Sequence, residues 1–148
     1  MKICFFIGHR DAPESIYDRL LQAVERHISG YGVTDFVVGR YGNFDCLAAR
    51  AVIEAKQHHS DITLTLLMPY YRADSEPLPV GFDGSLFPDD LETVPKRAAI
   101  LRANQYMIHH CDYLIAYDAG RIGNTRRLVA EAEKIEGLHI VNIASIPV

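Results

Sequence analysis

Short, continuous apolar runs alternate along the chain with longer segments in which apolar residues recur every three or four positions. A continuous run is typical of a strand buried on both faces of a sheet, and the wider spacing is typical of an amphipathic helix. The pattern predicts strands at 3–7, 36–38, 62–68, 113–117 and 139–143. It predicts helices at 16–28, 45–56, 94–110 and 125–136.

This alternation predicts an α/β fold with a mainly parallel, five-stranded sheet that carries helices on both faces. The simplest arrangement is doubly wound and Rossmann-like, with the strands in the order 3-2-1-4-5. In such sheets ligands bind beyond the carboxyl ends of the strands, where the winding reverses. That reversal would lie between the first and fourth strands, so the turns at 8–13, 39–45 and 118–125 should converge there.

The stretch 69–95 interrupts the alternation and holds five of the seven prolines. Loops of this length inside a compact domain are usually lids, binding loops or disordered segments. We expect it either to pack over the sheet or to contact a partner, including a second copy in a homodimer. Its apolar side chains are Tyr70, Tyr71, Leu78, Val80, Phe82, Leu86 and Phe87. The chain shows no linker or repeat, so we expect a single domain over 1–148.

Composition narrows the classes of partner. The 148 residues include 15 Lys+Arg and 19 Asp+Glu, for a net charge of −4. This balance disfavours nucleic-acid binding, which depends on many basic contacts to phosphates. No signal-peptide core is visible and no apolar run is long enough to cross a membrane. We interpret Cys4, Cys46 and Cys111 as packing residues in a reducing compartment and expect a cytoplasmic protein.

The first turn combines a glycine with charged residues before a helix. Gly8 allows a sharp turn, and the following helix start offers N–H groups to an anion. Arg10 could add a forked donor suited to phosphate or carboxylate. We interpret Asp11 as a helix cap ahead of Pro13. His9 is either an acid–base group or a packed, hydrogen-bonded residue.

The second turn carries Gly39, Gly42, Asn43 and Asp45 directly before a helix. Two glycines, an amide and a carboxylate can close around a phosphate or a ribose. The alternative is purely structural, because glycine and asparagine suit loops and Asp45 suits an N-cap.

The third turn feeds a helix through Gly123, Asn124 and Thr125, followed by Arg126 and Arg127. Cations in the first helical turn oppose the helix dipole by about 0.3–1 kcal/mol each when exposed. Their placement therefore favours a nearby anion or acidic neighbour. The alternative is that both side chains extend into water.

Three further residues bear on a site. Asp45 and Asp118 are the best-placed carboxylates for acid–base or nucleophilic work, although capping or loop roles explain them equally well. Asn104 falls on the apolar stripe of the third helix, where either the core or a ligand would have to bond its amide. The pairs His58–His59 and His109–His110 lack zinc-like spacing, so we expect no metal and no required cofactor.

Taken together, four segments resemble the SLOG family, in particular its small YpsA-like, single-domain bacterial members. In chain order they are FIGHRDAP, VVGRYGNFDCLAARAV, LFPDDLETVPKRAAILRANQYMIHHCDYLIAY and GRIGNTRRLVAEAEK. The resemblance implies a Rossmann-like fold that binds nucleotides or nucleotide-derived ligands, but it supplies no activity. It places on family motif positions Gly8, Arg10, Gly39, Gly42, Asp45, Asn104, Gly123 and Thr125.

Two functions follow as hypotheses. The leading one is binding or sensing of a nucleotide-derived molecule such as ADP-ribose or an NAD relative. The alternative is an N-glycosidic-bond hydrolase or deoxyribosyltransferase. The phosphoribohydrolase branch of the family carries a PGGxGTxxE motif, from which residues 121–128 depart by Asn124 and by the missing glutamate. The expected ligand-binding set is Gly8, His9, Arg10, Gly39, Gly42, Asn43, Asp45, Asn104, Asp118, Gly123, Asn124, Thr125 and Arg126.

Overall fold

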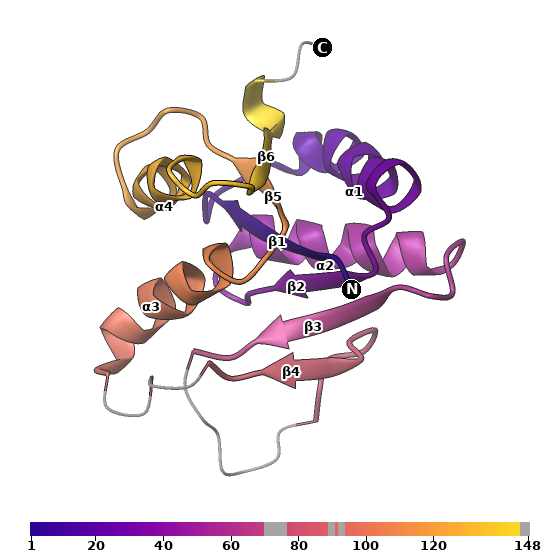
Figure 1. Ribbon diagram of the computed structural model, residues 1–148, viewed down its shortest axis with the longest axis horizontal. Coiled ribbons are helices and arrows are strands. Elements are labelled where there is room, and N and C mark those ends of the chain that lie inside the picture. Colours follow the sequence, from indigo (N-terminus) through magenta and orange to yellow (C-terminus); the bar gives the residue numbers. More distant parts are fainter. Residues whose placement is uncertain (70–76, 89–90, 92–93, 146–148) are drawn as a thin grey trace.

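The strands form one six-stranded parallel sheet in the order β4-β3-β2-β1-β5-β6 (Figure 1). The computed structural model describes residues 1–69, 77–88, 91 and 94–145. The strands are β1 (Ile3–Gly8), β2 (Asp35–Val38), β3 (Thr63–Leu67), β4 (Gly84–Leu86), β5 (Tyr113–Tyr117) and β6 (His139–Asn142).

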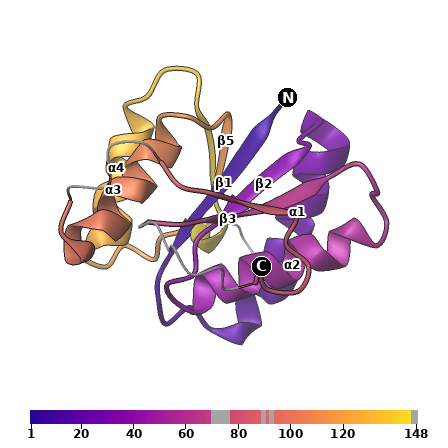
Figure 2. The ribbon, with the colours of Figure 1, turned by 90° about the horizontal axis from the view of Figure 1, so that it is seen from below.

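Helices cover both faces of this sheet, with α1 and α2 on one side and α3 and α4 on the other (Figure 2). The helices are α1 (Tyr17–Tyr31), α2 (Asn43–Lys56), α3 (Lys96–Ile108) and α4 (Asn124–Glu133), with short 3₁₀ turns at η1 (Glu14–Ile16) and η2 (Ile143–Ser145). Because side chains alternate along a strand, Phe5 and Phe6 of β1 belong to different hydrophobic clusters, one beneath each helical layer. The predicted doubly wound α/β fold is confirmed.

The predicted strand order is also confirmed, with one addition. β1 lies between β2 and β5, so the winding reverses where β1 and β5 adjoin. The addition is β4, which pairs with β3 from within the stretch 69–95. Its sequence, GSL, is too short and too polar to produce an apolar run. Only its pairing partner reveals it as a strand.

Hydrogen bonds from Lys56 hold β4 and its preceding loop against α2. Lys56 Nζ donates to Asp83 Oδ2 at 2.6 Å and to the Gly81 carbonyl at 2.9 Å. Asp83 Oδ2 also accepts the Leu64 N–H of the neighbouring strand at 2.8 Å. The described part of this stretch therefore packs on the domain, whereas Tyr70 and Tyr71 lie outside the described residues.

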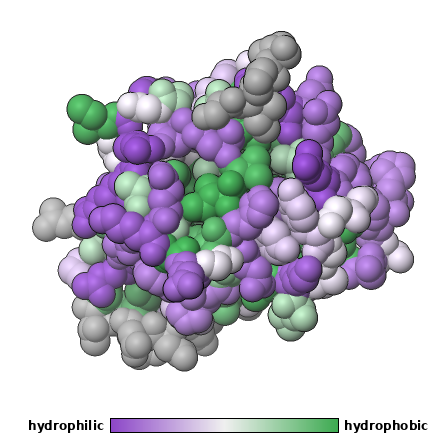
Figure 3. All heavy atoms as spheres, turned by 45° about the horizontal axis from the view of Figure 1, so that its top comes forward, coloured by the Kyte–Doolittle hydropathy of each residue, from purple (hydrophilic) through white to green (hydrophobic). Residues whose placement is uncertain are grey.

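The surface is mainly hydrophilic on the face drawn in Figure 3, with a narrow apolar area at its centre. No helix in the described ranges is long and apolar enough to cross a membrane. The interpretation of the cysteines is wrong in one case. Cys4 is buried and Cys111 is half-buried, but Cys46 is exposed because it lies on the outer side of α2. All three are free thiols.

Candidate functional site

The turns that follow β1, β2 and β5 meet at the carboxyl edge of the sheet. The Asn43 N–H donates to the Arg10 carbonyl at 2.7 Å, and the Asn43 side-chain amide donates to the Ala12 carbonyl at 2.6 Å. His9 Nε2 accepts the Ala119 N–H at 2.9 Å. These contacts join the first turn to the second and to the third. The predicted convergence is confirmed.

Two glycines make this convergence sterically possible. A Cβ on Gly8 would lie 2.3 Å from the Phe44 ring, so β1 could not end directly against the start of α2. Gly42 has a φ of +139°, and a Cβ there would lie 2.7 Å from Arg10 Cα. Both positions require glycine for close packing of the turns, whatever ligand the site takes.

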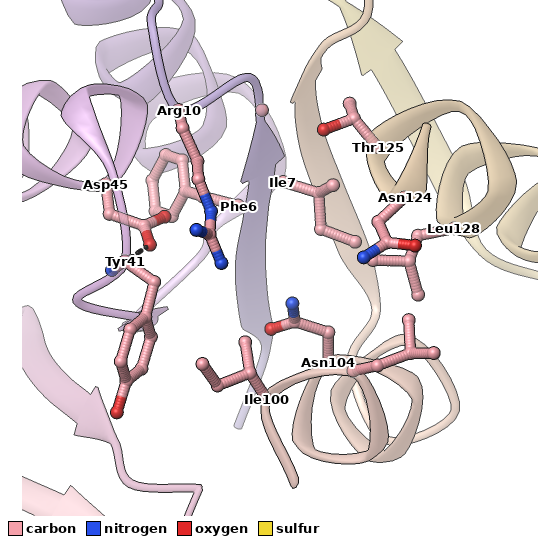
Figure 4. A pocket seen from close by; sticks show the side chains of 12 residues that line it. Phe6, Ile7, Arg10, Tyr41, Asp45, Ile100, Asn104, Asn124, Thr125 and Leu128 are labelled. Atoms are coloured by element: carbon pink, nitrogen blue, oxygen red, sulfur yellow. Dashed lines mark hydrogen bonds between the residues drawn. The ribbon is translucent and has the colours of Figure 1, made fainter. Parts of the chain in front are cut away.

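A pocket opens where the three turns meet, at the carboxyl end of β1 (Figure 4). We call it the switch-point pocket, and its volume is about 130 Å³. Residues from β1, the second turn, α3 and α4 face one another across it. Its lining is Phe6, Ile7, Gly8, Arg10, Tyr41, Asp45, Ile100, Leu101, Asn104, Asn124, Thr125 and Leu128.

A second cavity of about 280 Å³ adjoins this pocket, and we call it the outer hollow. Arg10, Asn124 and Thr125 line both. The outer hollow is completed by His9, Asp11, Arg121, Ile122 and Gly123. Small-molecule sites usually enclose about 300–1,000 Å³, so neither of these two cavities alone matches the size of a nucleotide, whereas the two together do.

Arg10 projects into the switch-point pocket from the first turn (Figure 4). Within the described part of the chain its guanidinium makes no hydrogen bond and no ion pair. Its charge lies close enough to Asp45 to lower the pKa of that carboxyl. A forked cation with open donors is suited to a phosphate or carboxylate of a ligand.

Two helices begin at the pocket without a capping side chain. Gly42 occupies the N-cap of α2 and Gly123 the N-cap of α4, and neither helix has a side-chain hydrogen bond at its cap. The first N–H groups of a helix carry a partial positive charge and suit an anion. Asn124 and Thr125, which open α4, line both cavities. The uncapped N–H groups at the start of α4 therefore add to the positive potential around Arg10.

Asp45 lies half-buried in the first turn of α2, where its Oδ2 accepts the Tyr41 N–H at 2.9 Å. Burial raises the pKa of Asp45 to about 6, although the Tyr41 N–H and the Arg10 charge both act to lower it. Its interpretation as an N-cap is wrong, because Gly42 holds that position. A Cβ on Gly39 would lie 3.0 Å from Asp45 Oδ2, so Gly39 leaves space for the carboxylate.

Asp118 has a contrasting environment at the end of β5. Its buried carboxylate accepts the Gly120 N–H at 2.9 Å and Arg126 Nη1 at 2.9 Å. Burial alone would raise the pKa of Asp118, but the Arg126 and Gly120 hydrogen bonds and the Arg126 charge hold it below its ordinary value. Asp118 and Arg126 line a different hollow, beside Asn142, and not the switch-point pocket. The sequence predicted a nearby anion or acidic neighbour for the arginines in the first turn of α4. For Arg126 that neighbour is Asp118.

His9 and Asp11 join the first turn to the third. Because His9 Nε2 accepts the Ala119 N–H, the ring is neutral with its proton on Nδ1. Burial, followed by the charge of Arg121, lowers the pKa of His9. The interpretation of Asp11 as a helix cap is wrong, because Pro13 precedes the first 3₁₀ turn and Asp11 pairs with Arg121 at 2.6 and 2.9 Å.

The amide of Asn104 points from α3 into the switch-point pocket (Figure 4). From the sequence, either the core or a ligand could supply the hydrogen bonds of this amide. The structure places Asn104 in the wall of the pocket. Tyr41, Ile100 and Arg121 also line the site, although they are not among the residues predicted from the sequence. Arg121 had a signal, because it is a cation between Gly120 and Gly123 in a turn already selected. Tyr41 and Ile100 had none.

No protein-family model matches the chain, and no curated protein matches its sequence. The resemblance to the SLOG family therefore stays a prediction. Among the residues that the structure describes, no group of three or more His, Cys, Asp or Glu side chains could hold a metal ion. The polar lining of the two cavities includes arginines, side-chain amides, the N-terminus of α4 and Asp45.

Proposed function

We propose that the switch-point pocket and the outer hollow bind a nucleotide-derived small molecule, such as ADP-ribose or an NAD relative. The observation that carries this proposal is Arg10, whose open guanidinium projects into a cavity at the reversal point of a parallel sheet. Ligands of such sheets bind at that point. The resemblance to the SLOG family supports the same class of ligand.

The ligand would lie with an anionic group between Arg10 and the first N–H groups of α4. Asp45 would accept hydrogen bonds from ribose hydroxyls, and Asn104 would supply a neutral donor and acceptor across the pocket. Apolar side chains such as Ile100 offer surface for a base. Each group therefore meets a part of the ligand with matching chemistry.

A thermal-shift panel of nucleotides, ADP-ribose and dinucleotides tests the proposal. A ligand at a hundredfold excess over its Kd stabilises the folded protein by about 2.7 kcal/mol, which is a readable shift in Tm. Arg10→Ala should abolish the shift. Arg40→Ala is the matched control, because Arg40 is exposed in the adjacent turn and does not line either cavity. The proposal is wrong if no compound shifts Tm, or if both variants respond alike.

A second candidate function is cleavage or transfer at an N-glycosidic bond. The observation that favours it is the pKa of about 6 for Asp45, which lets a carboxyl in the pocket exchange a proton near neutral pH. In hydrolysis, water would add to the anomeric carbon of the ribose and the base would leave with a proton. Free base measured by chromatography should disappear in Asp45→Asn. Release that persists in this variant would contradict the role of Asp45.

A further inference from the structure

An exposed ion pair spans the mouth of the outer hollow. Arg121 Nη2 lies 2.6 Å from Asp11 Oδ1, and Nη1 lies 2.9 Å from Oδ2, so the contact is a two-pronged fork. Both side chains are more than half exposed. Both also line the cavity that holds Arg10 and the first residues of α4. Arg121 is thus a second arginine beside the proposed anion site, and Asp11 neutralises its charge.

The turn that carries Arg121 is held by hydrogen bonds just before this residue and is exposed to solvent just after it. His9 holds the Ala119 N–H, and the Asp118 carboxylate holds the Gly120 N–H. Beyond these anchors, Ile122 is fully exposed to solvent. Arg121 can therefore change partner by rotating its side chain, without disturbing β5 or α4.

We propose that the Asp11–Arg121 pair is a latch, and that Arg121 leaves Asp11 to bind the second phosphate of a diphosphate ligand. The first phosphate would lie between Arg10 and the N-terminus of α4. The inference rests on the proposed function and narrows its ligand class to diphosphate-containing molecules in preference to monophosphates.

The charges around the outer hollow support this exchange. Arg10 and Arg121 are cations, His9 is neutral, and Asp11 is the anion among its lining residues. An exposed ion pair contributes little net stability, so opening it costs little. A phosphate offers the same forked geometry with stronger charge-assisted hydrogen bonds. Asp11 meanwhile repels an incoming anion, so its carboxylate opposes binding in two ways.

Calorimetry with inorganic pyrophosphate and inorganic phosphate, in buffer free of divalent cations, tests the latch. The wild type should bind pyrophosphate more tightly than phosphate. Arg121→Ala should weaken pyrophosphate binding by about tenfold and remove most of this preference. Asp11→Asn, which releases Arg121 and removes the competing charge, should tighten pyrophosphate binding by about fivefold.

The matched control is Glu14→Gln. Glu14 forms an equally exposed pair with Arg50 at 2.8 Å, outside both cavities. This variant removes one negative charge from the nearby surface but should leave pyrophosphate affinity unchanged. The latch is wrong if Arg121→Ala binds pyrophosphate as tightly as the wild type does. It is equally wrong if Asp11→Asn binds it no more tightly than Glu14→Gln does.

The same variants, assayed with AMP and ADP-ribose, separate this inference from the proposed function. If ADP-ribose binding needs Arg10 but is unaffected in the Arg121→Ala and Asp11→Asn variants, the latch fails and the proposed function stands. If pyrophosphate binding needs Arg121 but no nucleotide binds, the latch stands and the nucleotide proposal fails. If neither pyrophosphate nor any nucleotide binds, both are overturned.

Discussion

Two aspartates lie at the same carboxyl edge of the sheet, and their surroundings differ sharply. Asp118 sits at the end of β5, where a backbone N–H and Arg126 both donate to its buried carboxylate. Asp45 sits in the first turn of α2, where a backbone N–H donates to it and the nearest cation, Arg10, forms no ion pair with it. The pKa of Asp118 is consequently lowered and that of Asp45 is raised to about 6.

This difference separates a structural carboxylate from one that suits a binding site. Removing a buried charge from its full set of partners leaves those partners unpaired and destabilises the fold. A half-buried charge without an ion-pair partner destabilises the fold, and such costs concentrate at functional sites. In the sequence both aspartates are candidates for the same reason, because each lies in a turn at the carboxyl end of a predicted strand. Their partners assign Asp118 to the architecture of the third turn and Asp45 to the pocket.

The largest effect in this comparison should come from Asp118→Asn. The neutral amide cannot accept from both Arg126 and the Gly120 N–H as the carboxylate does, so we expect a loss of about 2 kcal/mol of unfolding free energy at pH 7. Because the folded pKa is lowered, the wild-type stabilisation is present above about pH 4 and is lost as the pH falls through the folded value. Urea unfolding at pH 7 measures the loss. A variant as stable as the wild type would contradict the structural role.

The substitution of asparagine for Asp45 should change the free energy of unfolding in the opposite direction. Asp45→Asn keeps an oxygen for the Tyr41 N–H and removes a poorly solvated charge, so it should stabilise the protein by about 1–2 kcal/mol at pH 8. The folded pKa is raised from 3.8 to about 6, so the benefit should be absent below about pH 4, grow between pH 4 and 6 and level off above pH 6. Urea unfolding at both pH values tests this. Destabilisation at pH 8 would mean that Asp45, like Asp118, has a structural role.

The smallest effect concerns His9, which fixes the turn next to Asp118. Because burial lowers the folded pKa of His9, its contribution is present above about pH 6.5 and is lost as the pH falls. His9→Gln supplies an acceptor that does not titrate, so the variant should lose less stability than the wild type between pH 7 and pH 5, by under about 1 kcal/mol. His27 is also buried with a lowered pKa, but it is present in both proteins and cancels. Identical acid profiles would contradict a neutral, hydrogen-bonded His9.

Most of the fold could be predicted because its periodicities are local. The apolar runs of β1 and β5 and the helical spacing of α2 each report the burial of one segment. Parallel pairing and right-handed crossovers then leave few ways to arrange such segments. β4 escaped because a three-residue edge strand has no periodicity to detect.

The position of the site could be predicted as well, whereas the roles of its residues could not. The turns that meet at the pocket follow from the strand order alone. The contacts that decide each role join residues far apart in the chain. Asp11 and Arg121 are separated by 110 positions, and so are His9 and Ala119. Local spacing in the sequence cannot tell whether an aspartate such as Asp11 caps a helix or pairs with a distant arginine.

The sequence by itself determined the doubly wound sheet, the convergence of its turns and the presence of arginine at that point, since these depend on local patterns of burial and on composition. Only the tertiary structure decided which charges are paired. Arg126 pairs with Asp118 and Arg121 pairs with Asp11, whereas the guanidinium of Arg10 lies beside Asp45 without an ion pair among the described residues. The physical reason is that the strength of an electrostatic interaction depends on distance and solvent exposure in three dimensions.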